Sequence, residues 1–346
     1  PTAAMDEIPV QQAQIVKAQC RQGMVEHWGN TSVAIPDSEL TVSVISGGLS
    51  NRNYLVKLSP KACELTAPSP FTSVFLRVFG CDGELGLDEK DDLHCLSQAG
   101  LAGIASRVLG TFEGGRCEEF LEGARTWGVQ DLRDSNRSQA LARLLATLHG
   151  RPLCADLAPN LFSTRLRTWG AAAVRAASVH TALGGRNAAL VAAVQVASLA
   201  EVEVPWFFRE VLPLVNSPVV LCHGDLNQGN ILELSVDRSE RSPRGGDDGD
   251  EGCQEGASMS TSTRSLVGKE LRFVDFEFGG ACHRGFDLAN ALWERAIDNQ
   301  SDRFPGFALD ADHYPNLSQQ RAFLLAYLGL NDDGDSGCGS QHHRNS

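Results

Sequence analysis

LCHGDLNQGN at residues 221–230 and FVDFE at residues 273–277 are the two stretches that decide the fold of this chain. Each contains a short apolar run that is typical of a buried strand. Together they offer Asp225, then Asn230 five residues later, and then Asp275. Either stretch alone would indicate an ordinary turn beside a strand, since Gly, Asp and Asn are common turn residues. Both together, in this order and spacing, favour a chemical site.

The three polar side chains suit transfer of a phosphoryl group. This reaction depends mainly on positioning and charge neutralisation, so it needs few side chains. One carboxylate accepts the proton of the substrate hydroxyl, while an Asn and a second carboxylate hold Mg²⁺ on the phosphates. Here Asp225 is predicted to be the base, and Asn230 and Asp275 the metal ligands. The pattern therefore predicts an ATP-dependent and Mg²⁺-dependent enzyme of the protein-kinase type.

Length and composition limit the kind of protein. The chain has 346 residues, enough for two lobes with a core each, and 42% of them are hydrophobic. Its formal net charge of −13 argues against nucleic acid or an anionic membrane as a main partner, because both select clustered Lys and Arg. The ten cysteines include no Cys-x-x-Cys pair, and neither a signal-peptide pattern nor a membrane-spanning run is found. These features favour a cytoplasmic protein without membrane insertion.

The first 122 residues predict a small β-rich lobe that binds the nucleotide. Apolar residues at helical spacing predict a helix ahead of the sheet, at Val16, Cys20, Met24 and Trp28. Five strands and one helix are then expected, the strands at 40–45, 53–58, 74–79, 107–112 and 116–121 and the helix at 88–99.

Residues 123–330 predict a larger, mostly helical catalytic lobe, so the fold class is α+β with two lobes. The expected helices include 138–149 and much of 159–214, and short strands at 219–222, 231–234 and 271–274 are embedded among them. Residues 235–268 and the tail 331–346 hold almost no large apolar side chains, so a disordered insertion and a disordered polar tail are expected. The nucleotide is expected between the lobes.

Two features of the first lobe point to phosphate. A glycine-rich turn lets backbone N–H groups approach phosphate oxygens, although a plain hairpin turn is the alternative; its residues are Gly47, Gly48, Leu49, Ser50 and Asn51. Arg77 lies in the middle of an apolar strand, where a cation needs a partner or a ligand. Asp92, or else Asp91, is the predicted partner of Arg77, and a solvent-facing cation is the alternative.

A helical face follows the second motif. Asp287, Asn290 and Glu294 are spaced so that they share one side of a helix. Glu294 and the aromatic Phe278 are candidates for a pocket that binds an amine, whereas an ordinary solvated helix face is the alternative. His223 is predicted to support the loop rather than to transfer protons, and His149 is predicted to be structural.

These motifs resemble the eukaryotic choline/ethanolamine kinases. The glycine-rich turn is similar to that family's phosphate loop, residues 75–80 to its nucleotide-gripping strand, and residues 275–290 to its characteristic extension. The resemblance implies a protein-kinase-like fold, ATP as co-substrate, Mg²⁺, phosphorylation of an amino alcohol for phospholipid synthesis and, in many members, a homodimer.

The resemblance also implies roles for individual residues. Asp225 is the base, and Asn230 and Asp275 bind Mg²⁺. ATP binding is implied for Arg77, Asn227 and the 47–51 turn, with a hinge at the adenine made of Glu119, Phe120 and Leu121. Substrate binding is implied for Glu277, Phe278 and Glu294, and supporting roles for His223, Arg284, Asp287 and Asp92.

Ethanolamine is the favoured substrate, and its product phosphoethanolamine would enter the CDP-ethanolamine route to phosphatidylethanolamine. Residues 84–88 and 217–223 look more like ethanolamine kinases, and Asn299 stands where choline kinases tend to have Tyr. A quaternary ammonium favours an aromatic cage, whereas a primary ammonium prefers hydrogen-bond acceptors. The alternatives are a choline or dual-specificity kinase, a kinase of another small molecule such as an aminoglycoside or sugar, and a catalytically silent binding protein.

The chain also departs from the family pattern. His-Gly-Asp replaces the usual His-Asn-Asp, and the helix acid expected to pair with Arg77 is Asp rather than Glu. Family members continue beyond the position of Leu330 with a helical segment whose aromatic residues close the substrate pocket. This sequence is therefore expected to lack part of that pocket wall.

Overall fold

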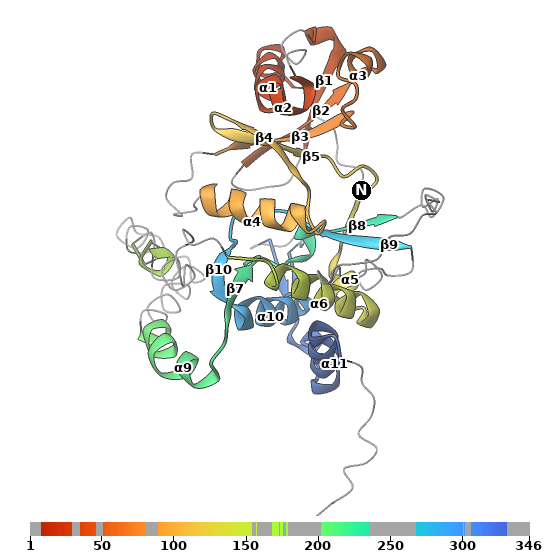
Figure 1. Cartoon of the computed structure of the whole chain (residues 1–346). Helices are drawn as coiled ribbons and strands as arrows, with labels where there is room; N and C mark the ends of the chain where they lie inside the picture. The colour runs from red at the N-terminus through yellow and green to blue at the C-terminus, as the bar shows by residue number, and fades with distance from the viewer. Residues whose placement is uncertain are drawn as a thin grey trace, which may run out of the picture.

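The computed structural model describes residues 8–29, 35–45, 51–80, 89–153, 157, 168–172, 174–175, 178, 202–235, 268–299, 301 and 306–330. Figure 1 shows a sheet with short helices at one end of the molecule and a mainly helical part at the other. The predicted insertion and tail lie outside the described residues, except for the insertion's two ends. Within the described part of the chain, no helix combines the length and the apolar character needed to cross a membrane.

The first part is built on a five-stranded antiparallel sheet in the order β1-β2-β3-β5-β4. Its strands are β1 (Leu40–Ile45), β2 (Asn51–Leu58), β3 (Ser73–Phe79), β4 (Val108–Phe112) and β5 (Gly115–Glu119). All five predicted strands are confirmed. The pairing places the centre of β3 between β2 and β5, so Arg77 is held in the middle of the sheet.

Three helices accompany this sheet: α1 (Val10–Gly23), α2 (Val25–Trp28) and α3 (Pro60–Leu65). Val16, Cys20, Met24 and Trp28 are all buried, as their helical spacing predicted. They form one hydrophobic core with apolar side chains of the sheet. Burial of such side chains stabilises the fold by about 25 cal/mol per Å² of apolar surface removed from water.

Helix α4 (Glu89–Leu101) lies beneath the sheet, between the two parts of the molecule (Figure 1). Its buried side chains Cys95, Leu96 and Ala99 belong to the larger core of the second part. The helix predicted at 88–99 is confirmed, and it packs toward the second part of the molecule as well as against its own sheet. The division of the lobes near residue 122 stays a prediction.

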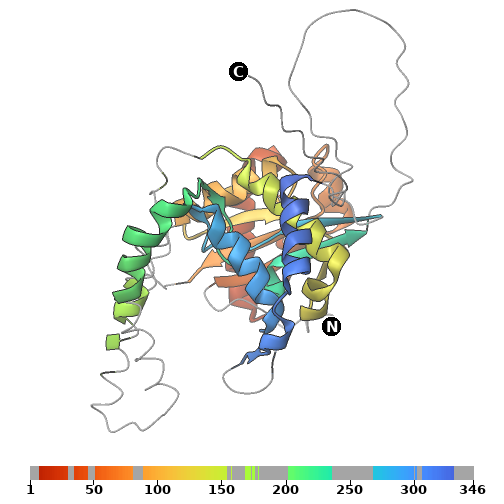
Figure 2. The same cartoon turned by 90° about the horizontal axis from the view of Figure 1, so that it is seen from below.

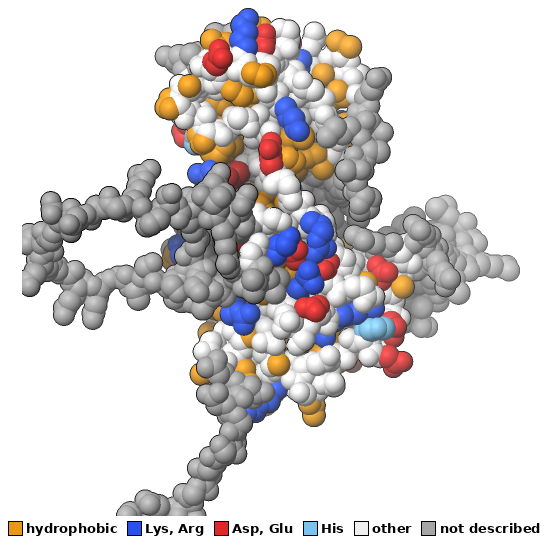
Figure 3. Space-filling model, turned by 90° about the vertical axis from the view of Figure 1, so that its right-hand side faces the viewer, with side chains coloured by type: hydrophobic (Ala, Val, Ile, Leu, Met, Phe, Trp, Pro, Cys, Tyr) orange, Lys and Arg blue, Asp and Glu red, His pale blue; other side chains and the backbone are white. Residues whose placement is uncertain are grey.

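The second part contains short antiparallel sheets. One sheet pairs β7 (Val219–Cys222) with β10 (Gly280–His283). A second has the order β6-β8-β9, and its strands are β6 (Arg125–Thr126), β8 (Ile231–Ser235) and β9 (Lys269–Phe273). A third pairs β11 (Ile297–Asp298) with β12 (Ala308–Leu309). The strands predicted around the two decisive stretches are confirmed. Figure 3 shows Lys and Arg side chains mixed with Asp and Glu on the side of the molecule where β8 and β9 lie.

Buried Glu233 on β8 forms ion pairs with two arginines on this side of the molecule. Arg125 and Arg137 approach its carboxylate to 3.2 and 3.1 Å. Burial acts to raise the pKa of Glu233, but the hydrogen bonds from the two arginines hold that pKa below its usual value. These cations are therefore paired with acids.

The helical layer comprises α5 (Val129–Arg133), α6 (Ser135–His149), α9 (Leu212–Val215), α10 (Arg284–Trp293) and α11 (Leu317–Leu328). Short helical turns accompany it: η4 (Phe207–Val211), η5 (Gln228–Asn230), η8 (Glu294–Ala296) and η9 (Ala311–His313). A further turn, η2 (Asp37–Glu39), leads into β1 of the first sheet. Helices α6 and α11 lie side by side, next to α10 (Figure 2). Apolar side chains of these three helices share one core with β7, β8 and β9.

Both α6 and α11 begin at side-chain caps. Asp134 accepts a hydrogen bond from the Arg137 N–H at the start of α6. Asn316 and Gln319 bond to each other's backbone N–H groups at the start of α11, and Gly329 ends that helix with a φ of 69°. Such caps satisfy backbone groups that have no partner within the helix.

Candidate active site

The loop between β7 and β8 presents the residues of the first decisive stretch. Gly224 turns the chain with a φ of 84°, in the left-handed region that glycine adopts readily. Asn227 caps the short turn η5, because its Oδ1 accepts the Gly229 N–H at 2.7 Å. The loop thus has a defined shape, and Asp225 lies between its two turns.

Asp225 is held from one side. Its Oδ2 accepts hydrogen bonds from Asn227 Nδ2 and Asn230 Nδ2, both at 2.8 Å. Its Oδ1 accepts no hydrogen bond from the part of the chain that the structure describes. One carboxylate oxygen is therefore fixed, and the other is available to a substrate proton.

Asn230 turns its amide nitrogen toward Asp225. Its amide nitrogen bonds to both the side chain and, at 3.0 Å, the backbone carbonyl of Asp225. The amide oxygen is therefore turned away from Asp225. Asn227 was assigned to ATP binding from the sequence, but its side chain bonds within the loop and it is not among the residues lining the cavity described below.

His223 supports the loop, as predicted. Its ring is fully buried against Phe273 and Phe276. Its Nδ1 accepts the Asp225 N–H at 3.3 Å, so the ring proton belongs on Nε2, which lies 3.0 Å from the Val274 carbonyl. One neutral imidazole thus connects both decisive stretches.

Helix α10 holds the same loop from its other side. Buried Asp287 accepts the backbone N–H groups of His223 at 2.7 Å and Gly224 at 3.0 Å. Asn290 Oδ1 accepts the Leu226 N–H at 2.6 Å. Burial acts to raise the pKa of Asp287, but the hydrogen bond from His149 and the loop N–H groups hold it below the usual value. The shared helical face that the spacing predicted is therefore real.

Asp275 lies opposite this loop, directly after β9. It has a φ of 66°, unusual for a residue other than glycine, and this kind of backbone strain is common at functional sites. Its Oδ1 accepts a hydrogen bond from Arg77 Nη1 at 2.8 Å. Strand β3 of the first sheet and the second decisive stretch thus meet through one ion pair.

The predicted pair of Arg77 with Asp92 was wrong. Asp92 makes a two-pronged ion pair with Arg116, at 2.6 and 3.2 Å. Arg116 also donates to Glu118 at 2.8 Å, and Glu118 lies 3.7 Å from Arg77 Nε. Arg116 and Arg77 face each other in the register of β5 and β3, so one buried acid serves both arginines.

This network contains residues that the sequence reasoning missed. Burial acts to raise the pKa of Glu118, but the guanidinium groups of Arg116 and Arg77 keep it below its usual value, so Glu118 stays ionised. The signal was present, since Arg116 and Glu118 are charged residues within a strand, where a buried charge needs a partner.

A cavity of about 520 Å³ opens between the two parts of the molecule. Its walls come from the first sheet, from the predicted hinge and from both decisive stretches; the lining residues relevant here are Arg77, Glu119, Phe120, Leu121, Asn230 and Asp275. Residues that the sequence assigned to ATP and Mg²⁺ thus line one cavity, and their roles stay a prediction. Gly47 to Ser50 of the predicted phosphate turn lie outside the described residues.

The lining suits a phosphate with a divalent cation. Carboxylate and amide oxygens are ligands that Mg²⁺ accepts, and Asp275 and Asn230 supply them. Arg77 is buried, and among the described residues its Nε makes no hydrogen bond, although Glu118 lies 3.7 Å away. A buried guanidinium beside a cavity favours an anionic ligand.

Glu294 lies at the end of α10 and is buried. Asn299 donates to its Oε2 at 2.9 Å and Asn290 to its Oε1 at 3.3 Å. Burial and the charge of Asp225 raise the pKa of Glu294 to about 7. A buried carboxylate in the field of a second one is a favourable place for a cation.

The remaining predicted residues lie around these groups. Asn51, at the start of β2, donates to Glu277 at 3.1 Å, so part of the Glu277 carboxylate is already engaged. Phe278 packs edge-on against Trp169, which the sequence reasoning had not singled out. Arg284 opens α10, where its N–H donates to the Pro218 carbonyl.

Gly224 is expected to be essential for the approach of the two loops. A Cβ at this position would lie 2.3 Å from the carbonyl oxygen of Phe278, so the close contact requires glycine where the family pattern has Asn. Gly224→Ala is expected to lower the free energy of unfolding by about 1–3 kcal/mol, from the positive φ and the clash. Denaturant unfolding measures this loss.

Gly103→Ala is the matched control. Gly103 has a φ of 65°, but a Cβ there meets nothing within 4 Å, so the variant carries the backbone cost without the clash. The Gly224→Ala loss is expected to exceed that of Gly103→Ala. Equal losses would contradict a required close approach.

Known proteins resemble this chain in sequence and structure. Over 310 residues it is 26% identical to choline kinase A2 of Caenorhabditis elegans, covering 87% of this chain and 68% of that protein. Over 305 residues it is 25% identical to a probable ethanolamine kinase of Arabidopsis thaliana, covering 88% and 66%. A crystal structure of choline kinase from Cryptosporidium parvum Iowa II superposes with a TM-score of 0.61 at 18% identity, covering 91% of this chain and 78% of that one.

The structural likeness confirms the α+β, protein-kinase-like two-lobe fold that the sequence predicted. The family model for choline/ethanolamine kinase matches residues 42–341, which include both decisive stretches, the cavity and Glu294. The loop, the paired carboxylates and this match lead to one conclusion: the chain belongs to the choline/ethanolamine kinase family.

Proposed function

We propose that the protein transfers the γ-phosphoryl group of ATP to the hydroxyl of ethanolamine, forming phosphoethanolamine. The observation that carries the proposal is the position of Asp225: Asn227 and Asn230 fix its Oδ2, and its Oδ1 accepts no hydrogen bond from the described residues. Family membership supports a kinase, and the buried Glu294 supports an amine as the acceptor.

Each group has a role in the transfer. Asp225 orients the substrate hydroxyl and accepts its proton as the oxygen attacks the phosphorus. Arg77 grips the phosphates, and Glu119, Phe120 and Leu121 face the adenine. Asn230 and Asp275 would hold Mg²⁺, which when bound neutralises charge on the phosphate oxygens.

Glu294 is the proposed partner of the substrate ammonium group. The ionised carboxylates of Glu294 and Asp225 repel each other. A cation beside Glu294 offsets this repulsion, because the cation interacts favourably with both carboxylates. The same carboxylate orients the amino alcohol, so that its hydroxyl end lies toward Asp225. Glu277 and Phe278 complete the proposed substrate wall.

Asn299 supports ethanolamine over choline. Its Nδ2 donates to Glu294 and, at 3.5 Å, to Gln228. Its Oδ1 can therefore accept a hydrogen bond from the substrate. A primary ammonium has N–H groups to give to this oxygen, whereas a trimethylammonium has none. The difference favours the smaller amine.

The test compares substrates with the purified chain. ATP, Mg²⁺ and either ethanolamine or choline are supplied, and the phosphorylated amine is measured by mass spectrometry. Ethanolamine is expected to have the higher kcat/KM. A higher value for choline would assign a choline kinase, turnover only of an aminoglycoside would assign another small-molecule kinase, and MgATP binding without turnover would indicate a silent binding protein.

Asn299→Tyr is expected to lower the preference for ethanolamine over choline by about 10-fold, because an aromatic face attracts a quaternary ammonium by about 0.5–2 kcal/mol. The ratio of the two kcat/KM values measures it. Asn299→Ala is the control that removes the amide without adding a ring. If Tyr and Ala shifted the ratio equally, the ring would have no part in the change.

A further inference from the structure

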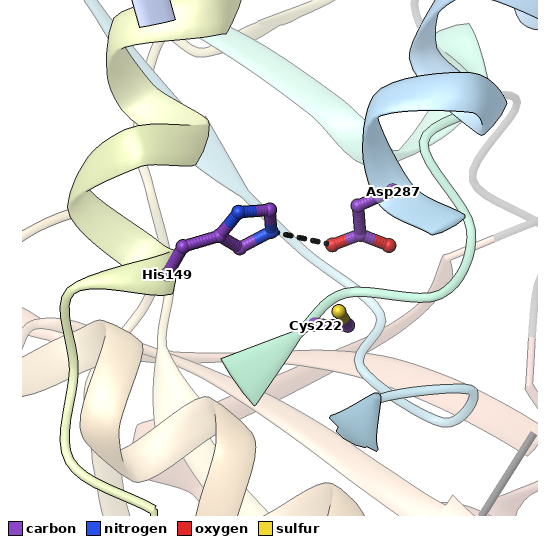
Figure 4. A group of neighbouring side chains, drawn as sticks. All are labelled: His149, Cys222 and Asp287. Carbon is purple, nitrogen blue, oxygen red and sulfur yellow. Dashed lines mark hydrogen bonds and ion pairs between the residues drawn. The ribbon is translucent and has the colours of Figure 1, made fainter. Parts of the chain in front are cut away.

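Three polar side chains from different elements meet next to the loop that carries Asp225, and none of them lines the cavity. They are His149 at the end of α6, Asp287 on α10 and Cys222 on β7, all buried (Figure 4). Their ligand-type atoms all lie within 4.8 Å of one another. Such a group is either a metal site or a hydrogen-bonded network, and the bonding of its atoms distinguishes the two.

The donor and acceptor atoms of this group are already engaged. Asp287 Oδ2 lies 3.2 Å from His149 Nε2 and also accepts the His223 N–H, while Oδ1 accepts the Gly224 N–H. The Cys222 thiol lies 3.6 Å from the Cys282 carbonyl. Its contact with Cys282 and its burial raise the pKa of Cys222 well above the usual range, which keeps the thiol protonated and a poor metal ligand. The hydrogen-bonded arrangement therefore fits better.

The network continues to the last helix. His149 Nδ1 lies 2.8 Å from the hydroxyl of Tyr327 on α11, and the two rings meet edge to face. Because the ionised Asp287 can only accept, His149 Nε2 carries a proton toward it, and Nδ1 and the Tyr327 hydroxyl form the next hydrogen bond of the network. The side chain of Arg284 also faces that hydroxyl.

We propose that Tyr327 and His149 are positioning residues for phosphoryl transfer, acting through Asp287 on the backbone of His223 and Gly224. This inference rests on the proposed function only in naming Asp225 as the base. A carboxylate that takes two loop N–H groups sets the position of the loop, and the imidazole sets the rotation of that carboxylate. Helices α6 and α11, which lie side by side (Figure 2), thereby fix the residue next to Asp225.

The hydrogen-bond relay that runs from Tyr327 through His149 and Asp287 to the loop backbone predicts a graded response of kcat to substitution. His149→Leu removes the donor to Asp287 and is expected to lower kcat about 10-fold, with the KM values for ATP and amine changed less than about threefold. His149→Gln places an amide N–H where Nε2 was, so it is expected to recover most of this loss. Tyr327→Phe removes only the outer hydroxyl and is expected to have a smaller effect. Tyr54→Phe, which deletes a hydroxyl on β2, is the matched control and is expected to leave kcat unchanged.

Amide hydrogen exchange of the full chain tests the relay without turnover. Exchange in peptides covering residues 219–226 is expected to be faster in His149→Leu than in the unsubstituted chain and to return toward it in His149→Gln, while peptides of the first sheet stay unchanged. Unaltered exchange and kcat in His149→Leu would overturn the proposal. Equal losses in the Leu and Gln variants, with faster exchange throughout the molecule, would mean a merely structural role and would also overturn it.

Two further outcomes are distinguished. If the unsubstituted chain phosphorylates no amine, the proposed function fails, and the exchange pattern alone decides whether the relay positions the loop. Metal analysis of the purified protein is expected to find no stoichiometric transition metal. One equivalent of zinc that is lost in both His149→Leu and Cys222→Ser would overturn the hydrogen-bonded relay in favour of a metal site.

Discussion

Asp225→Asn is expected to lower kcat by about 10²–10⁴-fold, because the amide cannot accept the proton of the substrate hydroxyl. The amide oxygen can still accept from Asn227 and Asn230, which now bond to the carboxylate. The free energy of unfolding is therefore expected to change by less than about 1 kcal/mol. Steady-state kinetics and denaturant unfolding of the same preparation measure both quantities.

Asp312→Asn is the matched control for this substitution. Asp312 is exposed on η9, so the same chemical change there is expected to alter neither kcat nor stability. Asp225→Asn protein that retains more than about a tenth of the unsubstituted kcat would contradict the assignment of Asp225 as the base.

Glu294→Gln is expected to lower kcat/KM for the amine by about 100-fold, since a charge-assisted hydrogen bond to the ammonium contributes about 1.5–3 kcal/mol. The KM for ATP is expected to stay near its original value. Because the pKa of Glu294 is raised to about 7, kcat/KM for the amine is expected to rise with pH up to about 7 and then to level off. In Glu294→Gln this rise is expected to vanish.

The same variant is expected to be more stable than the unsubstituted chain at pH 8. A carboxyl group with a pKa near 7 in the folded state, above its usual 4.5, favours folding while protonated, and this contribution is lost as pH rises through about 7. The difference corresponds to about 3 kcal/mol, so a gain of about 1–3 kcal/mol is expected at pH 8 and almost none at pH 4.

Denaturant unfolding of Glu294→Gln at the two pH values measures this gain. Glu113→Gln, at an exposed position, is the control and is expected to show no pH-dependent difference. A loss of amine kcat/KM without the stability gain would mean that Glu294 is not held in an unfavourable ionised state. A gain in stability without loss of activity would mean that Glu294 does not contact the substrate.

Much of the framework could be predicted because it depends on local patterns. Strand-like runs bounded by turn residues predicted the five strands of the first sheet, and the helical spacing of Val16 and Cys20 predicted the buried face of α1. The spacing of Asp287, Asn290 and Glu294 also predicted a shared helical face. Such periodicities follow from backbone geometry, which is the same in every protein.

The partners of buried charges could not be predicted in this way. Arg77 was expected to meet Asp92, yet it pairs with Asp275, far away in sequence, while Asp92 pairs with Arg116. Choosing among several acids requires the strand register and the position of α4, and neither is contained in local sequence. The same holds for His149, which a helix-end position indicated only as structural.

The sequence by itself determined which chemical groups are present and in what order: a carboxylate, an amide and a second carboxylate, followed by a further carboxylate, Glu294. Only the tertiary structure decided the pKa values and the relative positions of these groups. The raised pKa of Glu294 depends on its burial and on the nearby charge of Asp225, and the fixed position of the catalytic loop depends on Asp287. Burial and long-range electrostatic interactions arise only when distant segments pack together.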